Sequence, residues 1–272
     1  MPIRFSISEN YDRYMDRRRD CYHKLVKNGE VLKTKKSYRR GYPVAMLLGF
    51  EEHSVALWSV FSKVVKPLRT LRTNGNPTDP KALYNLYECT IDALRPSFKE
   101  GVRSVILVSP LKTSYSKDFR NHVEKHHSWL VHGTSKTAFA ELAGNACTIA
   151  HLTSLTRNPA FQKIVNETTT EENTNLIELI EIKLNVTGPK DNVLYSLEEA
   201  ESLMFRSKTN IEPEYLLLTD KYLAENPRKG RINKLLQIAA NKKIKTRIVK
   251  ADSAAGKRLS QLGGFVCIVK VL

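Results

Sequence analysis

The sequence predicts an α/β protein, with two three-layer α/β domains preceded by a basic N-terminal arm. Short runs of consecutive apolar residues alternate along the chain with longer segments of helical period. Such runs are typical of strands that helices cover on both faces. The length of 272 residues favours two domains, and a segment with a Gly-Pro pair is the predicted hinge at 185–192. We therefore expect an arm at 1–42, a first domain at 43–186 and a second domain at 192–272.

The arm combines positive charge with tyrosines. It contains twelve Lys and Arg against five Asp and Glu, a net charge of +7 out of +16 for the whole chain. Basic side chains neutralise the phosphates of a nucleic acid, and tyrosine rings stack on unpaired bases. The arm is therefore predicted to bind RNA, with a solvated basic tail as the alternative. The predicted contacts are Arg17, Arg18, Arg19, Lys33, Lys35, Lys36, Arg39 and Arg40.

The first domain begins with a strand at 44–48, where the residues are uninterruptedly apolar. Residues 51–65 place apolar side chains on one helical face, and a helix is expected there. The next helix, at 81–94, follows an Asp-Pro pair that suits a cap and a first-turn proline. Residues 103–108 form another apolar run between two breakers, which is typical of a strand in a parallel sheet.

The rest of the first domain is predicted to be helical. Helical periods cover 116–128 and 136–143, and a longer helical region covers 158–184. Within that region an Asn-Pro pair begins one helix, and the Thr-Glu-Glu segment at 170–172 is expected to begin a second helix.

The second domain contains the clearest alternation. A helix at 197–205 leads to a strand at 215–219, a basic amphipathic helix at 231–241 and a strand at 245–249. A Gly-Gly turn then returns the chain to a final strand at 266–269. The basic residues of this domain form a predicted RNA or partner face, with a solvated surface as the alternative. They are Arg228, Lys229, Arg231, Lys234, Lys242, Lys243, Lys245 and Arg247, and the first four are the predicted RNA contacts.

Composition limits the class of partner and the compartment. The net charge of +16 indicates a polyanion, and nucleic acid is favoured over a membrane. The sequence contains no run of about 18 apolar residues, so no membrane span is predicted. A signal peptide is not expected either, because the first residues show no apolar segment of that kind. The four cysteines form no C-x-x-C pair, which fits a reducing cytoplasm. An Ala-Gly-Lys-Arg segment lacks the rest of a phosphate-binding loop, so no nucleotide cofactor is expected.

Four histidines gather in one region of the first domain: His122, His126, His127 and His132. The first two stand at i and i+4 on a predicted helix, the spacing of a metal-binding pair. The sequence indicates no third ligand, so no metal is predicted and an exposed basic face is favoured. His132 and Lys136 are predicted RNA contacts on this face. Cleavage of RNA by these imidazoles is the alternative.

Three collinear segments resemble one protein family. The first is SVILVSP at 104–110, followed by SKDFRNHVEKH. The second is NPAFQKIVNETTTEENTNLIELIEIKL at 158–184, and the third is NVLYSLEEAESLMFRSKTNIEPEYLLLTD with a later GKRLSQLGGFVCIV. In this order they resemble the middle and C-terminal domains of the archaeal and eukaryotic release factor/Pelota superfamily. The resemblance covers about residues 43–272.

The sequence departs from that family in two places. The basic arm stands where the family has its N-terminal decoding domain. The Gly-Gly-Gln loop with which release factors hydrolyse peptidyl-tRNA is replaced by His-Gly-Thr-Ser-Lys-Thr at 132–137. The resemblance therefore implies no stop-codon-dependent peptide release, and Pelota, or truncated relatives that act on stalled large subunits, is the nearer likeness.

The resemblance and the charge together predict a ribosome-associated translation factor that binds ribosomal RNA or tRNA. It is expected to act in rescue, recycling or hibernation of ribosomes in the cytoplasm, without catalysis of its own. The expected partner besides the ribosome is an elongation-factor-like GTPase or an ABC-type recycling ATPase. Two alternatives stay open. One is a peptidyl-tRNA hydrolase or tRNA-end nuclease that uses His132 or His126, and the other is a stand-alone RNA-binding module.

Overall fold

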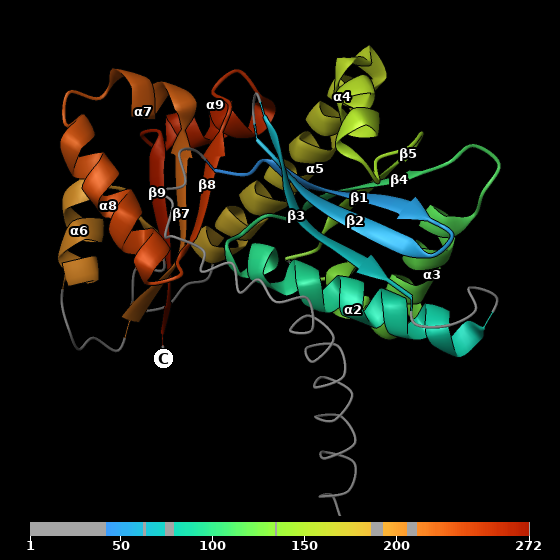
Figure 1. The fold of residues 1–272 in the computed structure, drawn as a ribbon. Helices are drawn as coiled ribbons and strands as arrows, with labels where there is room; N and C mark the ends of the chain where they lie inside the picture. The colour runs from blue at the N-terminus through green and yellow to red at the C-terminus, as the bar shows by residue number, and fades with distance from the viewer. Residues whose placement is uncertain are drawn as a thin grey trace, which may run out of the picture. The chain divides into compact units, whose positions relative to one another are not determined.

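A computed structural model gives the fold of the chain, which is mixed α/β as predicted (Figure 1). The residues that it describes are 42–61, 64–73, 79–133, 135–185, 193–205 and 211–271. The predicted RNA contacts of the arm lie outside these residues. So do all but the first residue of the predicted hinge, and the predicted division into domains therefore stays a prediction.

The first sheet has five strands in the order β3-β2-β1-β4-β5. The chain first forms an antiparallel meander, in which β1 pairs with β2 and β2 pairs with β3. Strands β4 and β5 then extend the sheet in parallel from the other edge of β1. The strands are β1 (Ala45–Glu51), β2 (Ser54–Val60), β3 (Val65–Arg72), β4 (Ser104–Ser109) and β5 (Ala138–Ala143).

Helices cover both faces of this sheet (Figure 1). Alternate residues of β1 point to opposite cores: Met46 packs with the helices α2 and α3, and Leu47 packs with α4 and the first half of α5. The result is the three-layer arrangement expected for the first domain. The helical elements are α2 (Pro80–Lys99), α3 (Tyr115–His126), the 3₁₀ helix η1 (Ser128–Leu130), α4 (Ile149–Arg157) and α5 (Pro159–Asn185).

The second sheet has four strands in the order β6-β9-β7-β8, with β7 and β8 parallel and β9 antiparallel to both of its neighbours. The strands are β6 (Val193–Leu194), β7 (Ile211–Thr219), β8 (Lys245–Val249) and β9 (Phe265–Val271). Gly263 and Gly264 precede β9 with φ of 95° and 78°. These left-handed values favour glycine, and they confirm the predicted Gly-Gly turn.

The helices of the second sheet also form two layers. One layer contains α6 (Leu197–Phe205) and α8 (Lys229–Asn241), which pack on one face of the sheet. The other contains α9 (Ala254–Gln261) and the second half of α5, whose Leu176, Leu179 and Ile180 pack with β7 and β9. A short helix, α7 (Asp220–Glu225), follows β7 and was not predicted. Helix α5 therefore contributes to the cores of both sheets.

The predicted helix at 51–65 is wrong, because this segment contains β2, which lies between β1 and β3. All seven residues of β2 are buried. When both faces of a strand are covered, apolar residues occur without a period of two, so a helical period can be read by chance. The predicted helix at 136–143 is also wrong. Residues 138–143 of this segment form the edge strand β5, which completes the parallel half of the sheet.

The predicted helix start at 170–172 is also wrong, since α5 runs without interruption from Pro159 to Asn185. The threonines in this region bond back to the helix; Thr169 and Thr170 donate to the carbonyls of Val165 and Asn166, at 2.6 and 2.7 Å. Glu172, which resembled a first-turn acidic residue, is instead buried and only 1% exposed. Its carboxylate contacts residues that are distant in sequence and does not cap a helix.

The Glu172 carboxylate accepts three hydrogen bonds from elements distant in sequence. Arg247 of β8 donates from Nη2 to Oε2 at 2.5 Å, and Ser104 of β4 donates to the same oxygen at 2.5 Å. The backbone N–H of Arg103 donates to Oε1 at 2.8 Å. A buried charge is stable only when it is paired and hydrogen-bonded, and Glu172 meets both conditions.

Arg247 was predicted to lie on an exposed basic face, and this prediction is wrong because the residue is 4% exposed. Besides the ion pair with Glu172, its guanidinium donates to the backbone carbonyls of Pro43 and Val44 at 2.7 and 3.1 Å. This one side chain thus joins the second sheet to α5 and to the segment that enters β1.

We expect Arg247→Met to lower the free energy of unfolding by about 3–5 kcal/mol, because the substitution leaves the Glu172 carboxylate buried without its cation. Urea denaturation measures the change. The double variant Arg247→Met, Glu172→Leu should lose less than the sum of the two single variants. A matched control is Arg258→Met, which breaks an exposed pair with Glu181 and should cost less than about 1 kcal/mol. Equal losses for the two arginine variants would contradict this account.

Candidate functional site

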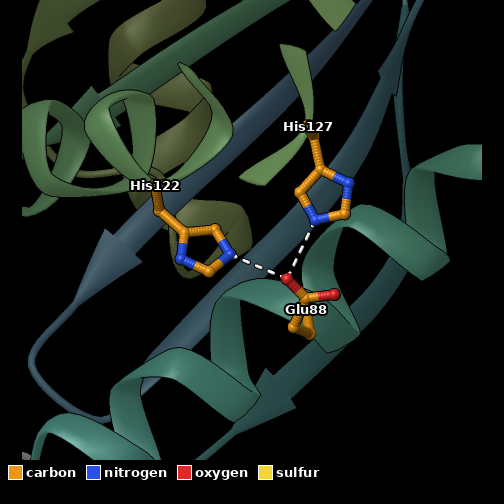
Figure 2. Close-up of side chains that lie close together, drawn as sticks. All are labelled: Glu88, His122 and His127. Carbon is orange, nitrogen blue, oxygen red and sulfur yellow. Dashed lines mark hydrogen bonds and ion pairs between the residues drawn. The ribbon is translucent and has the colours of Figure 1, made fainter. Parts of the chain in front are cut away.

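Three side chains from the α2–α3 layer meet at one point: Glu88, His122 and His127 (Figure 2). The Oε1 atom of Glu88 lies 2.9 Å from Nε2 of His122 and 2.8 Å from Nε2 of His127. These three atoms lie within 4.8 Å of one another. A single carboxylate oxygen is therefore within hydrogen-bond distance of two imidazoles.

Local sequence places each of these residues. Asp79 begins α2 by accepting a hydrogen bond from the backbone N–H of Lys81 at 3.0 Å, and Glu88 follows at the margin of the helix's buried stripe. His122 belongs to the buried stripe of α3 together with Phe119 and Val123. His127 is the first residue after α3 and has φ of −133° and ψ of 49°, so the chain leaves the helix there.

The two imidazoles are largely removed from water, with exposed fractions of 9% for His122 and 8% for His127. Aromatic rings surround them. The ring centroids of Tyr84 and Tyr87 lie 5.0 and 5.3 Å from that of His122, and Trp129 lies 6.4 Å from His127. Packing of this kind limits the rotamers that the imidazoles can adopt.

The hydrogen bond from His122 is the largest cause that lowers the pKa of the Glu88 carboxyl, to about 2, and the bond from His127 adds to it. Burial acts in the opposite direction and is weaker than the sum of these effects. Glu88 is therefore ionised at neutral pH. An ionised carboxylate only accepts hydrogen bonds, so the geometry assigns a proton to Nε2 of each imidazole.

The expectation of an exposed basic histidine face is wrong for His122 and His127, which are buried. His126 is exposed, and its ring centroid lies 4.8 Å from that of His122. The i, i+4 spacing thus correctly indicated that the rings of His122 and His126 are neighbours. The two histidines that share the Glu88 carboxylate are, however, His122 and His127. No local pattern indicated the third residue, because Glu88 lies 34 residues before His122 and on another helix.

The other two predicted residues of this region, His132 and Lys136, lie between η1 and β5. His132 is exposed and Lys136 is half-buried. In the part of the chain that the structure describes, neither side chain forms a hydrogen bond or an ion pair. Their predicted contact with RNA stays a prediction.

Acidic residues of α6 pair with the two arginines of the predicted RNA face of α8. Arg228 forms an ion pair with Glu198 of α6, and Arg231 pairs with Glu201 of the same helix. Arg231 also lies 3.3 Å from Glu198. Part of the positive charge of this face is therefore compensated within the protein.

Two lysines complete the predicted contacts on α8. Lys229 is exposed. The Nζ atom of Lys234 lies 5.5 Å from the ring centroid of Phe205, which is itself 56% exposed. A cation over an exposed aromatic ring could contact both the phosphate and the base of a nucleic acid.

Comparison with solved structures identifies the class of fold. Over 88% of its length the chain matches archaeal Pelota in a model of ribosome-bound Pelota and ABCE1, with a TM-score of 0.52 and 15% sequence identity. The match covers 64% of that Pelota chain. The protein thus has a Pelota/release-factor-like fold, as the sequence resemblance predicted.

Particular solved structures with this resemblance include Dom34 from S. cerevisiae, described as a translation termination-like factor that is involved in RNA quality control pathways and interacts with Hbs1. The match has a TM-score of 0.47 and 18% identity, and it covers 84% of this chain and 63% of Dom34. Pelota from Archaeoglobus fulgidus matches with a TM-score of 0.36 and 18% identity, over 84% of this chain and 64% of that chain. The chain thus spans just under two thirds of each of these proteins.

No protein-family model matches the sequence, and no curated protein matches it either. None of the helices in the described ranges is sufficiently long and apolar to span a bilayer.

We expect Glu88→Gln to destabilise the protein by about 1–3 kcal/mol at pH 7, because a neutral amide replaces an ionised acceptor shared by two imidazoles. The pKa of this carboxyl falls from its ordinary 4.5 to about 2 in the folded protein. Its ionisation therefore stabilises the fold above pH 4.5, and this contribution is lost as the pH falls towards 2. The difference between variant and wild type should accordingly narrow below pH 4.5.

Urea denaturation in the presence of a chelator, at several pH values between 7 and 3, measures this difference. The control is Glu124→Gln, which removes an exposed carboxylate that pairs with Arg120 on the same helix. It should change stability by less than about 0.5 kcal/mol. A Glu88→Gln effect that does not vary with pH would contradict the role given to this carboxylate.

Proposed function

We propose that the protein is a ribosome-associated translation factor that acts in rescue, recycling or hibernation of ribosomes without peptide release of its own. The observation that carries this proposal is the fold match to ribosome-bound archaeal Pelota over 88% of the chain. The collinear sequence segments that resemble the same superfamily support it independently of the fold.

The charge of the protein supports a ribosomal partner. A net charge of +16 favours a polyanion, and ribosomal RNA and tRNA are the polyanions that a factor of this fold would meet. In this proposal the basic arm supplies much of the RNA contact, because it contains twelve Lys and Arg against five Asp and Glu, a net charge of +7. The α8 face would contribute less, since α6 neutralises two of its arginines.

The residues at the hydrolytic loop support a role without peptide release. Gly-Gly-Gln does not occur anywhere in the sequence. Between η1 and β5, where the family resemblance places that loop, the chain reads His-Gly-Thr-Ser-Lys-Thr. Without the glutamine, the side chain that positions a water molecule in release factors is missing.

The proposal includes a partner that uses a nucleotide. The ribosome-bound archaeal Pelota of the comparison occurs together with ABCE1. By analogy with this arrangement, we infer that an ABC-type recycling ATPase or an elongation-factor-like GTPase acts with this protein in the cytoplasm. Co-sedimentation with ribosomes, followed by identification of the proteins in the same complex, tests both the ribosome and the partner.

We expect no release of peptide when the purified protein is added to ribosomes that hold peptidyl-tRNA at a stop codon. The measurement is the amount of free peptide relative to buffer alone, with a Gly-Gly-Gln release factor as the positive control. The same assay on stalled large subunits tests the hydrolase alternative. Release above buffer, abolished by His132→Ala, would replace the proposed function with a hydrolytic one.

Deletion of residues 1–40 should flatten the salt dependence of RNA or ribosome binding. If the arm contacts four to six phosphates, the log–log slope should fall by about three to five. The truncation retains Tyr42 and Pro43, because Tyr42 packs against the core of the second sheet and the Pro43 carbonyl accepts from Arg247. Stability should therefore be little changed.

The control for this deletion is Lys229→Gln, Lys234→Gln, which removes the two α8 lysines and leaves the arm intact. A slope that falls by no more than about two is expected for this variant. Equal slopes for the truncated and full chains would show that the arm is a solvated tail, and α8 would become the leading RNA site.

A further inference from the structure

We propose that Glu88, His122 and His127 bind a divalent transition-metal ion, with Zn²⁺ as the ion that their chemistry favours. The proposal does not depend on the proposed function. It assigns to the α2–α3 layer a site in which three protein ligands hold the ion and one position remains for water.

The donor set is the first argument. Two imidazole nitrogens and one carboxylate oxygen form a ligand set that zinc accepts, and sites with three such ligands keep a fourth position open. The set contains no thiolate, and imidazole favours Zn²⁺, Cu²⁺ or Ni²⁺ over Mg²⁺ and Ca²⁺. Of these, Zn²⁺ imposes the least geometric preference, so it tolerates the angles that this backbone provides.

The distances are the second argument. The three ligand atoms already converge, with Oε1 of Glu88 at 2.9 and 2.8 Å from the two Nε2 atoms. Zinc–ligand bonds of about 2.0–2.2 Å place tetrahedral ligand atoms about 3.3–3.5 Å apart. The two imidazole nitrogens lie within 4.8 Å of each other. An ion can therefore enter if these nitrogens come to the tetrahedral separation and the carboxylate oxygen moves back by roughly half an ångström from each of them. Glu88 can make this adjustment because its side chain is 31% exposed.

The burial of the two imidazoles is the third argument. Both rings are buried, and His122 projects from a helix whose Phe119 and Val123 are completely buried in the core. Sites of this kind bind metal well because their ligands lose little freedom on binding. The cluster thus combines two buried ligands with one partly exposed ligand that provides the route of entry.

Binding requires a change of tautomer but no external reactant. Each imidazole now carries its proton on Nε2, where it donates to Glu88. When Nε2 forms a bond to the metal, the proton is lost from Nε2 and one is held on Nδ1 instead, so each ring remains neutral. The ion replaces two hydrogen bonds with three metal–ligand bonds and thereby ties α2 to the end of α3.

Titration calorimetry of the full chain with ZnCl₂, after treatment with chelator and dialysis, tests the proposal. One ion should bind per chain, and Zn²⁺ should raise the melting temperature. Glu88→Gln, His122→Gln and His127→Gln should each weaken binding by at least about tenfold. His126→Gln is the matched control, because this exposed histidine lies beside the cluster without sharing its carboxylate. The affinity of the His126→Gln variant for Zn²⁺ should stay within about threefold of that of the wild type.

A measurement on the wild-type protein covers the case in which a histidine variant fails to fold. Co²⁺ in place of Zn²⁺ should give the intense visible absorption of a four-coordinate site, and ¹⁵N NMR should report metal at Nε2 of His122 and His127. The proposal is overturned if no stoichiometric ion binds, or if binding survives all three ligand variants. Metal on the exposed histidines would also overturn it, and the cluster would then be a hydrogen-bonded structural unit alone.

Discussion

The ion pair between Arg247 and Glu172 is the interaction on which the rest of the structure depends. It lies in the interior, where neither charge could persist without the other. Through it, β8 of the second sheet is joined to α5, to the start of β4 and to the segment that enters β1. Since α5 packs against both sheets, this contact joins the middle of the long helix to β8 of the second sheet and to β4 of the first.

The carboxylate of Glu88 differs from that of Glu172 in its burial and in its partners. Glu172 accepts three hydrogen bonds in the interior, one of them from the Arg247 cation, so it has a structural role. Glu88 shares one oxygen between two imidazoles and remains partly exposed. The first sheet separates the two sites, because α2 and α3 cover one face of it and α5 covers the other.

Positive charge is distributed unequally over the basic residues of the predicted RNA or partner face. Arg247 is buried and serves the fold, and Arg228 and Arg231 pair with α6. A tally of basic residues on a helix thus overestimates the charge available to a polyanion. This distribution favours the arm over α8 as the principal RNA contact in the proposed function, which the salt dependence of binding can decide.

The sequence by itself determined the elements whose burial is one-sided or whose ends carry local signals. The Asp-Pro start of α2, the apolar run of β4 and the Gly-Gly turn before β9 were predicted correctly, because caps, breakers and periods act over a few residues. Only the tertiary structure decided that β2 is a strand, that Glu172 lies inside an unbroken helix and that Glu88 meets His122 and His127. A strand covered on both faces loses its period of two, and a carboxylate's partners 34 or 75 residues away leave no trace in the local pattern.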